Sequence, residues 1–556
     1  MPTLDFKGKQ IVYAHHLTVP ARTLEVDAEK SLPSRKRGAF PPKDHQPSLD
    51  DNLIIHGDNL HALKALMPRY AGRVHCIYID PPYNTGNEKW VYNDNVNSPM
   101  MQAWLKDKSP VDGEDLERHD KWLCMMWPRL HLLHELLAED GVIFVSIDDN
   151  EQHHLRMMMD EIFGAENFVA NIVWQKKFSP QNDAKWISDS HDHIVCFAKD
   201  KPTWRPNRLP RSERMDKRYK NPDNDPRGSW ISTDLTRAEH RDRDYWPIET
   251  PAGKSVFPAK GRSWSRPAEN IEKLKKDNRL WFGPKNDRMP RLKKFLAEMD
   301  EGLTPQSLWL HTAVGHTQDA KKEIVSILDF EKSEDVFNTS KPSSLIKRIL
   351  QIATDKDSII LDAFAGSGTT AHAVLALNKE DNGNRKFILA ECEDYADTIT
   401  AERVRRVING VLTAKDEHLK NGLDGSFTYC TLGEEISPER MLTGENLPDY
   451  DTLARHLVYT ATGHAPDTVR KARSKDGCFY ETDDRLFYLI YEPDLAFLRS
   501  ADSALNGDRA ERIAKQAKTK HKAAVVFATH KFMGQKELSG MGIVFCGLPY
   551  ELSETG

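Results

Sequence analysis

Short apolar runs and amphipathic segments alternate along the first third of the chain. Apolar runs at 53–55 and 76–79 flank a segment in which Leu60, Leu63 and Leu66 recur at helical spacing. A short apolar run bounded by turn residues predicts a buried strand, and a three-to-four-residue spacing predicts an amphipathic helix. Because strand and helix follow each other in turn, the pattern predicts a parallel α/β sheet.

The alternation continues to about residue 200. Residues 119–137 carry Trp122, Met126, Leu130 and Leu133 at close to helical spacing, which core packing explains. The stretch "GVIFVSIDD" predicts another strand, and "EQHHLRMMMDEIFG" predicts another helix. The β-rich pieces "VANIVWQKK" and "HDHIVCFAK" predict a hairpin at the sheet edge.

One predicted strand ends in a turn of unusual composition, "CIYIDPPYNTG". Pro81 and Pro82 lack the backbone N–H that a sheet requires, so the strand stops at Asp80. The locked φ angles of the prolines, the Asp80 carboxylate and the Tyr83 ring make a rigid ledge. Such a ledge suits a planar group that presents an exocyclic amine to a carboxylate and a carbonyl.

A glycine turn forms the second centre of chemistry. The stretch "IILDAFAGSGTTA" joins an apolar strand to a helix through Gly366 and Gly368, with Ala371 at the third small position. This spacing fits the G-x-G-x-x-G/A turn, which brings a ligand close to a helix N-terminus. The next strand ends at Glu391, where an acid can bind ribose hydroxyls. The combination does not by itself separate a nicotinamide cofactor from S-adenosylmethionine.

Length and composition place these motifs in a larger protein. The 556 residues predict about three domains of roughly 150 residues each. No apolar run approaches the ~20 residues of a membrane span and no apolar signal core is found, so a cytoplasmic location is expected. Seven scattered cysteines form no CxxC pair, which predicts free thiols. His153, His154, His191 and His193 lack the spacing and partner ligands of a metal site, so no metal is predicted.

Residues 200–330 differ in character from the rest of the chain. They contain 27 Lys and Arg against 20 Asp and Glu, six of the twelve tryptophans, and the basic stretch "KPTWRPNRLPRSERMDKRYK". Basic residues interleaved with aromatic ones suit a surface that follows phosphates and stacks on bases. We therefore expect a DNA-binding region here. The alternative is a loop-rich insertion whose tryptophans form a small core of its own.

These patterns divide the chain into five parts. We expect an N-terminal arm at 1–45, the first half of a catalytic domain at 46–199, the DNA-binding insertion at 200–330, the second half of the catalytic domain at 331–412, and an assembly or partner-binding domain at 413–556. The arm shows no sustained period and is expected to be loosely ordered. Its basic cluster, Arg35, Lys36 and Arg37, is available for phosphate contacts.

The Asp-Pro-Pro-Tyr turn and the glycine turn together make the chain resemble the DNA amino-methyltransferases. Their order, with the basic insertion between them, resembles the β-class adenine-N6 enzymes. The chain is most similar to the Mod subunits of Type III restriction–modification systems and their stand-alone relatives. That resemblance rests on "GDNLHALKAL", "CIYIDPPYNTG", "GVIFVSIDDNE", "SKPSSLIKRIL" and "LDAFAGSGTTAHAVLALN".

The resemblance implies a fold, a reaction and partners. The fold is a doubly wound Rossmann-like, S-adenosylmethionine-dependent methyltransferase sheet, with an inserted target-recognition domain and a small C-terminal α/β domain. The implied reaction is methylation of the exocyclic N6 of an adenine flipped out of double-stranded DNA. The implied partners are DNA, a second copy of the chain in a homodimer, and a restriction (Res-type) subunit.

The resemblance also assigns roles to individual residues. The catalytic set that it implies is Asp80, Pro81, Pro82 and Tyr83, with the Asp80 carboxylate and the Pro81 carbonyl accepting the amine hydrogens and Tyr83 stacking on the base. The cofactor contacts that it implies are Asp58, Ser340, Lys341, Asp362, Phe364, Gly366, Gly368, Thr369 and Glu391. Two of these have simple structural alternatives: Asp58 as a helix cap after Gly57, and Lys341 as a solvated lysine at a helix start.

Three other functions stay open at this point. The same ledge could serve cytosine-N4 methylation, although an Asp before Pro-Pro-Tyr favours adenine, as the resemblance implies. A catalytically silent DNA-binding specificity subunit is the second alternative, and a nicotinamide oxidoreductase, suggested by the glycine turn alone, is the third. For methyl transfer, positioning and electrostatics carry most of the catalysis, and neither a metal nor a strong general base is required.

Overall fold

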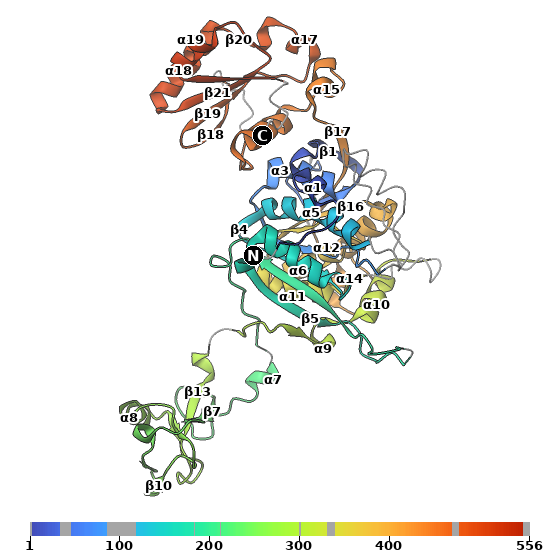
Figure 1. Cartoon of the computed structure of the whole chain (residues 1–556). Helices are drawn as coiled ribbons and strands as arrows, with labels where there is room; N and C mark the ends of the chain where they lie inside the picture. The colour runs from blue at the N-terminus through green and yellow to red at the C-terminus, as the bar shows by residue number, and fades with distance from the viewer. Residues whose placement is uncertain are drawn as a thin grey trace. The chain divides into compact units, whose positions relative to one another are not determined.

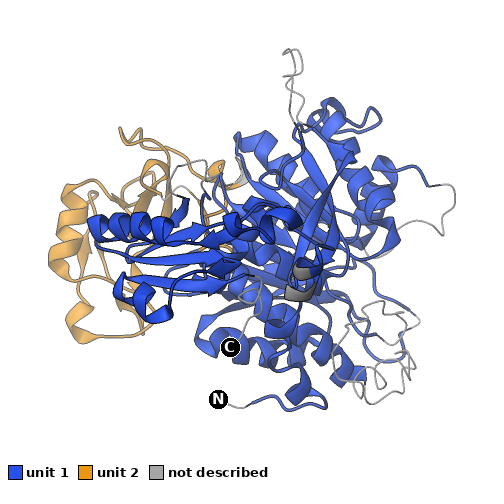
Figure 2. Ribbon diagram, turned by 90° about the horizontal axis from the view of Figure 1, so that it is seen from above, with its two compact units in different colours: residues 1–205, 306–556 blue, residues 206–305 orange. Residues whose placement is uncertain are grey.

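A computed structural model of the chain describes residues 3–33, 46–85, 118–182, 184–211, 213–299, 302–330, 340–469 and 477–548. The basic cluster at 35–37 lies outside the described residues. The chain forms two compact units (Figure 2): residues Met1–Arg205 with Gln306–Gly556, and residues Pro206–Pro305. The second unit is therefore an insertion in the first.

A ten-stranded sheet organises the first unit (Figure 1). Its order is β1 (Arg22–Leu32), β17 (Phe427–Glu435), β2 (Leu53–His56), β16 (Lys386–Glu391), β15 (Ile359–Asp362), β3 (Val74–Ile79), β4 (Leu137–Ile147), β6 (His191–Ala198), β5 (Phe168–Gln175) and β14 (Leu308–Trp309). Neighbouring strands from β17 to β4 are parallel. Strand β6 is antiparallel to β4 and to β5, as the predicted hairpin requires.

Helices cover both faces of this sheet. One face packs on α3 (Asn59–Tyr70), α5 (Arg118–Leu136) and α6 (Gln152–Met159), and the other packs on α11 (Ser343–Ala353) and α12 (Thr369–Asp381). Along β3, Ile77 and Ile79 join the core beneath α3 and α5, while Cys76 and Tyr78 are buried on the opposite face. A strand buried on both faces is typical of parallel sheets. The doubly wound α/β prediction is confirmed.

Six further helices in the described part of the first unit precede residue 422. They are α1 (Lys9–Val12), α2 (His15–Thr18), α9 (His311–Val314), α10 (Thr317–Ile327), α13 (Glu402–Asn409) and α14 (Glu417–Asn421). Among the described residues, no helix combines the length and the apolar character that crossing a membrane requires.

The N-terminal segment is not a loose arm. Strand β1 pairs antiparallel with β17, with Val26 opposite Cys430, and α1 and α2 pack against α5. The prediction for residues 1–45 is therefore wrong for residues 3–33. The strand lies at the sheet edge and is only partly buried, so its sequence lacks the apolar run of a central strand. Because β17 belongs to the same sheet, the boundary expected at 413 is also too early.

A four-stranded α/β sheet follows. Its order is β18 (Cys478–Glu481), β19 (Arg485–Leu489), β21 (Ala523–Ala528) and β23 (Ile543–Gly547). The helices of this region are α15 (Pro438–Thr443), α16 (Tyr450–Thr462), α17 (Leu495–Leu498), α18 (Gly507–Lys520) and α19 (Gln535–Gly540), and a further strand pair is β20 (Ala504–Leu505) with β22 (His530–Lys531). This region therefore has the α/β character that the resemblance implies.

The inserted unit has a small core and little regular structure. It contains α7 (Glu213–Asp216), β7 (Trp230–Asp234), β8 (Thr236–Arg237), β9 (Ile248–Glu249), β10 (Ser255–Val256), β11 (Ser263–Trp264), α8 (Ala268–Lys276), β12 (Leu280–Trp281) and β13 (Arg291–Phe295). The unit starts and ends inside the predicted 200–330 segment, because β14 and α10 belong to the first unit.

The tryptophans of the 200–330 segment are mostly buried. Trp264 is fully buried in the core of the inserted unit, and Trp230 is nearly so. Trp204 and Trp309 are buried in the first unit. The alternative of a small core of its own therefore holds for Trp264 and Trp230, and none of these four side chains is exposed for stacking on bases. The inserted unit still has 23 Lys and Arg against 16 Asp and Glu.

Candidate active site

The Asp-Pro-Pro-Tyr turn after β3 and the glycine turn after β15 lie at the switch point of the large sheet. Strands β15 and β3 are parallel neighbours, with Leu361 opposite Ile77. The chain continues from β3 to β4 on one side and from β15 to β16 on the other. Ligands of open α/β sheets bind in the crevice that forms where the strand order reverses in this way. The strands before Asp80 and Gly366 therefore lie side by side.

The turn after β3 is held from two sides. The Trp122 indole of α5 donates a hydrogen bond to the Pro82 carbonyl at 2.7 Å. Asn84 adopts the left-handed φ of 59°, and its amide donates to the Glu151 carboxylate and, at 3.3 Å, to the Arg118 carbonyl. The prolines fix the backbone between these anchors. The turn is therefore a rigid ledge.

The two oxygens of the Asp80 carboxylate have different surroundings. The Lys341 ammonium donates a hydrogen bond to Oδ2, while Oδ1 is buried and has no hydrogen-bond partner among the described residues. The same ammonium lies 5.1 Å from the centroid of the Tyr83 ring. Burial, with the charge of Asp80, raises the pKa of the Tyr83 hydroxyl well above its usual range. One Asp80 oxygen is thus fixed in place and the other can accept a hydrogen bond.

The glycine turn is held by acids at the ends of two strands. The Asp362 carboxylate accepts from the Phe364 amide at 3.0 Å and from the Thr370 hydroxyl at 2.5 Å. The Gly366 amide donates to Glu391 Oε2 at 2.7 Å. Burial raises the pKa of Asp362 to about 7 and raises that of Glu391 above its ordinary value. Both acids face the N-terminus of α12, which is the positive end of that helix's dipole and lies at the crevice.

Both glycines of the turn have positive φ, 51° at Gly366 and 74° at Gly368. A Cβ on Gly368 would lie 2.9 Å from the Thr400 carbonyl oxygen. Since backbone on that side cannot easily shift, the second glycine is needed for close packing against the neighbouring chain as well as for its φ.

Asp58 caps a helix. Its Oδ1 accepts from the Leu60 amide at 2.8 Å, and its Oδ2 lies 3.4 Å from the Arg129 guanidinium. Arg129 is fully buried and donates to Asn59 Oδ1 at 2.5 Å, and Asn59 in turn donates to the Ala363 carbonyl at 2.8 Å. The structural alternative for Asp58 is therefore present. Its contact with a cofactor stays a prediction.

Sequence reasoning did not identify Arg129. This residue ties the turn after β2 to the turn after β15 through Asn59. It lies seven residues after Trp122, on the apolar stripe of α5. A charged residue at a core position of an amphipathic helix is rare unless it is paired. The position of Arg129 on the apolar stripe was therefore the feature from which a buried, paired role could have been inferred.

A second buried arginine lies beneath the glycine turn. Arg403 donates to the Thr369 hydroxyl at 2.7 Å and to the Glu323 carboxylate at 3.2 Å. The Ser340 hydroxyl is 2.6 Å from the Ser367 hydroxyl in the same buried group. Ser340 and Thr369 thus already have partners inside the protein, and their predicted cofactor contacts stay predictions. Arg403 and Glu323 were also missed, since they are far apart in sequence.

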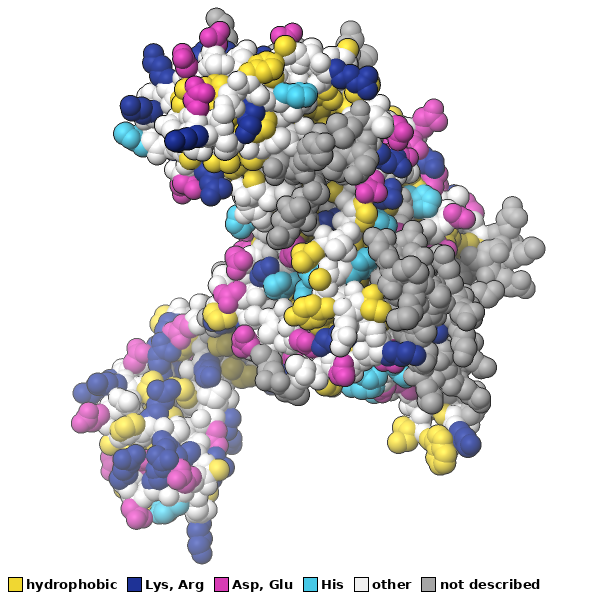
Figure 3. Space-filling view, turned by 45° about the horizontal axis from the view of Figure 1, so that its top comes forward, with side chains coloured by type: hydrophobic (Ala, Val, Ile, Leu, Met, Phe, Trp, Pro, Cys, Tyr) yellow, Lys and Arg dark blue, Asp and Glu magenta, His cyan; other side chains and the backbone are white. Residues whose placement is uncertain are grey.

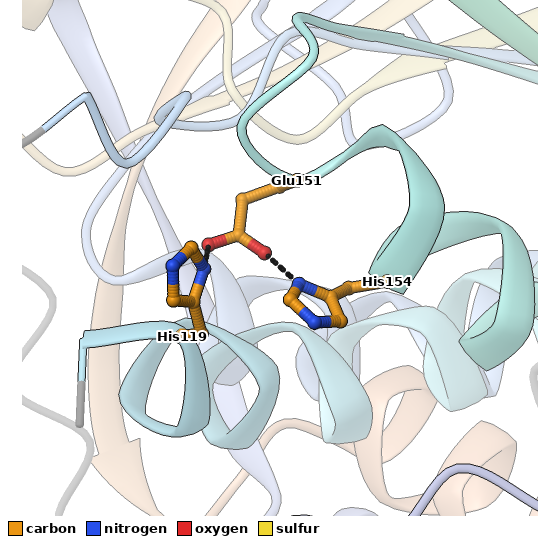
Figure 4. Close-up of side chains that lie close together, drawn as sticks. All are labelled: His119, Glu151 and His154. Atoms are coloured by element: carbon orange, nitrogen blue, oxygen red, sulfur yellow. Dashed lines mark hydrogen bonds and ion pairs between the residues drawn. The ribbon is translucent and has the colours of Figure 1, made fainter. Parts of the chain in front are cut away.

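A buried carboxylate, Glu151, holds the ledge through Asn84 and also contacts two histidines, which Figure 4 shows. Glu151 is fully buried, and it accepts hydrogen bonds from Nδ1 of His119 at 2.6 Å and Nδ1 of His154 at 2.8 Å, in addition to the Asn84 amide. These ligand types, which lie within 4.8 Å of one another, are those of a metal site. In this structure they form a complete hydrogen-bond network.

A similar group joins Asp149, His191 and His193. The spacing argument against metal ligation by histidines did not anticipate either group, because β4, α5 and β6 bring their members together from separate segments. The prediction that the protein holds no metal stays a prediction.

We expect Glu151→Ala to loosen the ledge. Three donors, from Asn84, His119 and His154, would lose their shared acceptor, at a cost of about 1–3 kcal/mol. Thermal unfolding and amide hydrogen exchange of Tyr83, Asn84 and Thr85 would measure the effect. Glu139→Ala, which removes an exposed carboxylate, is the control and should change neither. Unaltered exchange at these three amides in Glu151→Ala would show that Glu151 does not hold the turn.

The sheet, its switch point and the two turns define the class of Rossmann-like methyltransferases. The family model described as DNA methylase, for N6 and N4 methylation, matches residues 74–402, more than half of the chain. The chain belongs to this family.

Three curated relatives show how far the similarity extends. The chain is 37% identical over 442 residues to the Type III restriction-modification enzyme StyLTI Mod subunit of Salmonella typhimurium, covering 74% of this chain and 64% of that protein. It is 30% identical over 457 residues to the EcoPI Mod subunit of Escherichia phage P1, covering 72% and 68%. It is 31% identical over 367 residues to the Type II methyltransferase M.KpnI of Klebsiella pneumoniae, covering 61% and 80%. The chain thus spans less than two thirds of the StyLTI Mod subunit.

Proposed function

We propose that this protein is a site-specific DNA methyltransferase that transfers a methyl group from S-adenosylmethionine to N6 of an adenine flipped out of double-stranded DNA. The observation that carries the proposal is the Asp80 carboxylate, at the end of β3, with one buried oxygen free of partners among the described residues and beside the glycine turn of β15. Membership of the DNA methylase family supports the same reaction class.

The residues of the crevice fit S-adenosylmethionine. The turn before α12 has no side chain at positions 366 and 368, and the buried acids Asp362 and Glu391 accept hydrogen bonds from the backbone amides of Phe364 and Gly366 in that turn. These acids suit an ammonium group and ribose hydroxyls, respectively. Phe364, which is nearly buried, would provide the apolar wall. When bound, S-adenosylmethionine supplies an electrophilic methyl group.

The ledge would orient the target amine. Asp80 Oδ1 would accept one amine hydrogen and the Pro81 carbonyl the other, which aims the nitrogen lone pair at the methyl group. Lys341 donates a hydrogen bond to Oδ2, so it fixes the direction of the carboxylate. The base would stack on the Tyr83 ring. Pro82 and Trp122 keep the ring in position through the backbone.

Partners follow from the same proposal. Double-stranded DNA is the substrate, and the inserted unit with its excess of basic residues is the proposed target reader. A homodimer and a Res-type restriction subunit complete the proposed assembly, and the similarity to Mod subunits of restriction-modification enzymes supports the restriction subunit. The proposed location is the cytoplasm, where seven free cysteines are expected.

Nucleoside mass spectrometry of DNA treated with the protein and S-adenosylmethionine tests the proposal. N6-methyladenine is the expected product. If N4-methylcytosine is the only methylated base found, the target base is cytosine and not adenine. Intact cofactor and DNA binding without any methylated base would favour the silent specificity subunit. Methylation-sensitive sequencing of DNA from expressing cells would then map the recognition site.

Glu391→Gln is expected to weaken cofactor binding about tenfold, because an amide cannot accept hydrogen bonds through both of its ends. Glu391 now accepts from the amides of Gly366, Cys392 and Glu393, so one of these would face an N–H donor in the variant. Isothermal titration with S-adenosylmethionine measures the change. Glu393→Gln is the neighbouring control, and equal affinities in both variants would contradict the role of Glu391.

A further inference from the structure

The connection between β5 and β6 displays large hydrophobic side chains to solvent. Within residues 176–190, Phe178 is 68% exposed, Trp186 85% and Ile187 92%. Single exposed hydrophobic residues are ordinary on protein surfaces, but three on one short connection call for a partner. The teal connection extends beyond the end of the sheet in Figure 1, and Figure 3 shows hydrophobic and basic side chains together at the end of a projection on the lower right. We call residues 176–190 the β5–β6 arm.

The arm leaves the sheet at the catalytic edge. Strand β6 is antiparallel to both β4 and β5, so β5 runs in the same direction as β4 and its parallel neighbour β3. The end of β5 therefore lies on the same edge as Asp80. Strand β5 is three positions from β3, which is roughly 14 Å at ordinary strand spacing. Seven extended residues reach about 23 Å, so the arm is long enough to reach DNA held over the crevice.

The root of the arm is fixed beside the active site. The Lys176 ammonium forms ion pairs with Asp189 at 2.9 Å and with the buried Asp192 at 2.5 Å. The Lys176 carbonyl accepts from the Thr317 amide at 3.1 Å. Burial raises the pKa of Asp192, and the nearby charges of Lys176, Lys341 and Asp80 also act on that pKa, so the root and the Asp80 ledge share one electrostatic environment.

Hydrogen bonds link parts of the arm to one another, and lysines lie near its hydrophobic side chains. The Gln181 amide donates to the Ser188 hydroxyl at 2.8 Å, and the Lys177 ammonium donates to the Gln181 side chain at 3.2 Å. The Lys185 ammonium lies 5.5 Å from the centroid of the Trp186 ring. Apolar side chains with lysines beside them match the chemistry of a DNA duplex, in which phosphates flank stacked bases.

We propose that the β5–β6 arm is a wedge that enters the duplex next to the extruded base, with Trp186 and Ile187 occupying the space that the base leaves. Lys177 and Lys185 then meet the flanking phosphates. Apolar wedges of this kind offset the cost of unstacking a base step, which is a few kcal/mol. The inference rests on the proposed function, since a wedge has this role only if a base is extruded.

The test compares paired and mismatched substrates. The double variant Trp186→Ala/Ile187→Ala is assayed with a duplex that carries the mapped site, and with the same duplex carrying a mismatch opposite the target adenine. A mismatch lowers the cost of extrusion. We expect kcat/KM on the paired duplex to fall about 10- to 100-fold, and activity on the mismatched duplex to stay within about threefold of the wild type. Trp186→Phe should retain most activity.

Two controls distinguish a wedge from a general loss of activity or of assembly. Phe532→Ala removes a hydrophobic side chain that is 66% exposed on the C-terminal sheet region, and it should leave both substrates unaffected. Sedimentation of the double variant should give the oligomeric state of the wild type. An equal loss on both duplexes, no loss on either, or a changed oligomeric state would overturn the wedge. An inactive wild-type protein would instead overturn the proposed function, on which the wedge depends.

Discussion

Asp80→Ala is expected to abolish most methyl transfer while leaving cofactor binding intact. The variant removes the buried Oδ1 that would accept an amine hydrogen, and it leaves Lys341 without its carboxylate. Loss of one preorganised hydrogen-bonding group in a catalytic site typically costs about 10²- to 10³-fold in kcat. The measurement is single-turnover transfer of labelled methyl groups to a duplex that carries the mapped site, with cofactor affinity determined separately by titration.

The control for Asp80→Ala is Asp484→Ala, which removes a carboxylate that is 72% exposed in the C-terminal region. It should have wild-type rates. Lys341→Met gives an independent view of the same ion pair, since it frees both Asp80 oxygens without removing them. An Asp80→Ala protein with unchanged kcat would exclude the orienting role of this carboxylate, whatever its effect on stability.

The central features of the fold could be predicted because they have local signatures. A buried strand ended by two prolines at Asp80, and a strand that meets Gly366, each show their structure within about ten residues of sequence. The rule that ligand crevices form at switch points explains why these two strands are neighbours. The same reasoning failed for β1, which lies at an exposed edge and lacks an apolar run.

The parts of the site that sequence could not predict depend on long-range contacts. Glu151 reaches Asn84 from 67 residues away, and Arg403 reaches Glu323 from 80. No rule of sequence spacing predicts either contact, since the lengths of the helices and strands between the partners decide whether they meet. The ion pair between Lys341 and Asp80 spans 261 residues and was not anticipated, because the resemblance placed Lys341 near the cofactor. Buried polar networks of this kind become visible only in the packed structure.

Cofactor binding should depend on pH through Asp362. Burial, together with the charges of Asp80 and Glu391, raises the pKa of this carboxyl to about 7, although hydrogen bonds from Thr370 and the Phe364 amide oppose the shift. If the ionised carboxylate receives the cofactor ammonium, affinity for S-adenosylmethionine should rise roughly tenfold from pH 6 to pH 7.5, where the α-amino group stays largely protonated. Titration calorimetry in buffers of different ionisation enthalpy should show release of about one proton at pH 6.

The apo protein should show the opposite trend in stability. The pKa of Asp362 is higher in the folded state, about 7, than its ordinary value of 3.8, so its contribution to stability is fully present below pH 3.8 and is lost as pH rises through 7. Three pKa units correspond to about 4 kcal/mol. Asp362→Asn removes this dependence, so the melting temperature of the variant should rise relative to that of the wild type between pH 5 and pH 8. The affinity of the variant for the cofactor should be weak and should not depend on pH. If the melting temperatures of the variant and the wild type differ by the same amount at every pH, the titrating group is not Asp362. The same conclusion follows if the cofactor affinity of the variant still depends on pH.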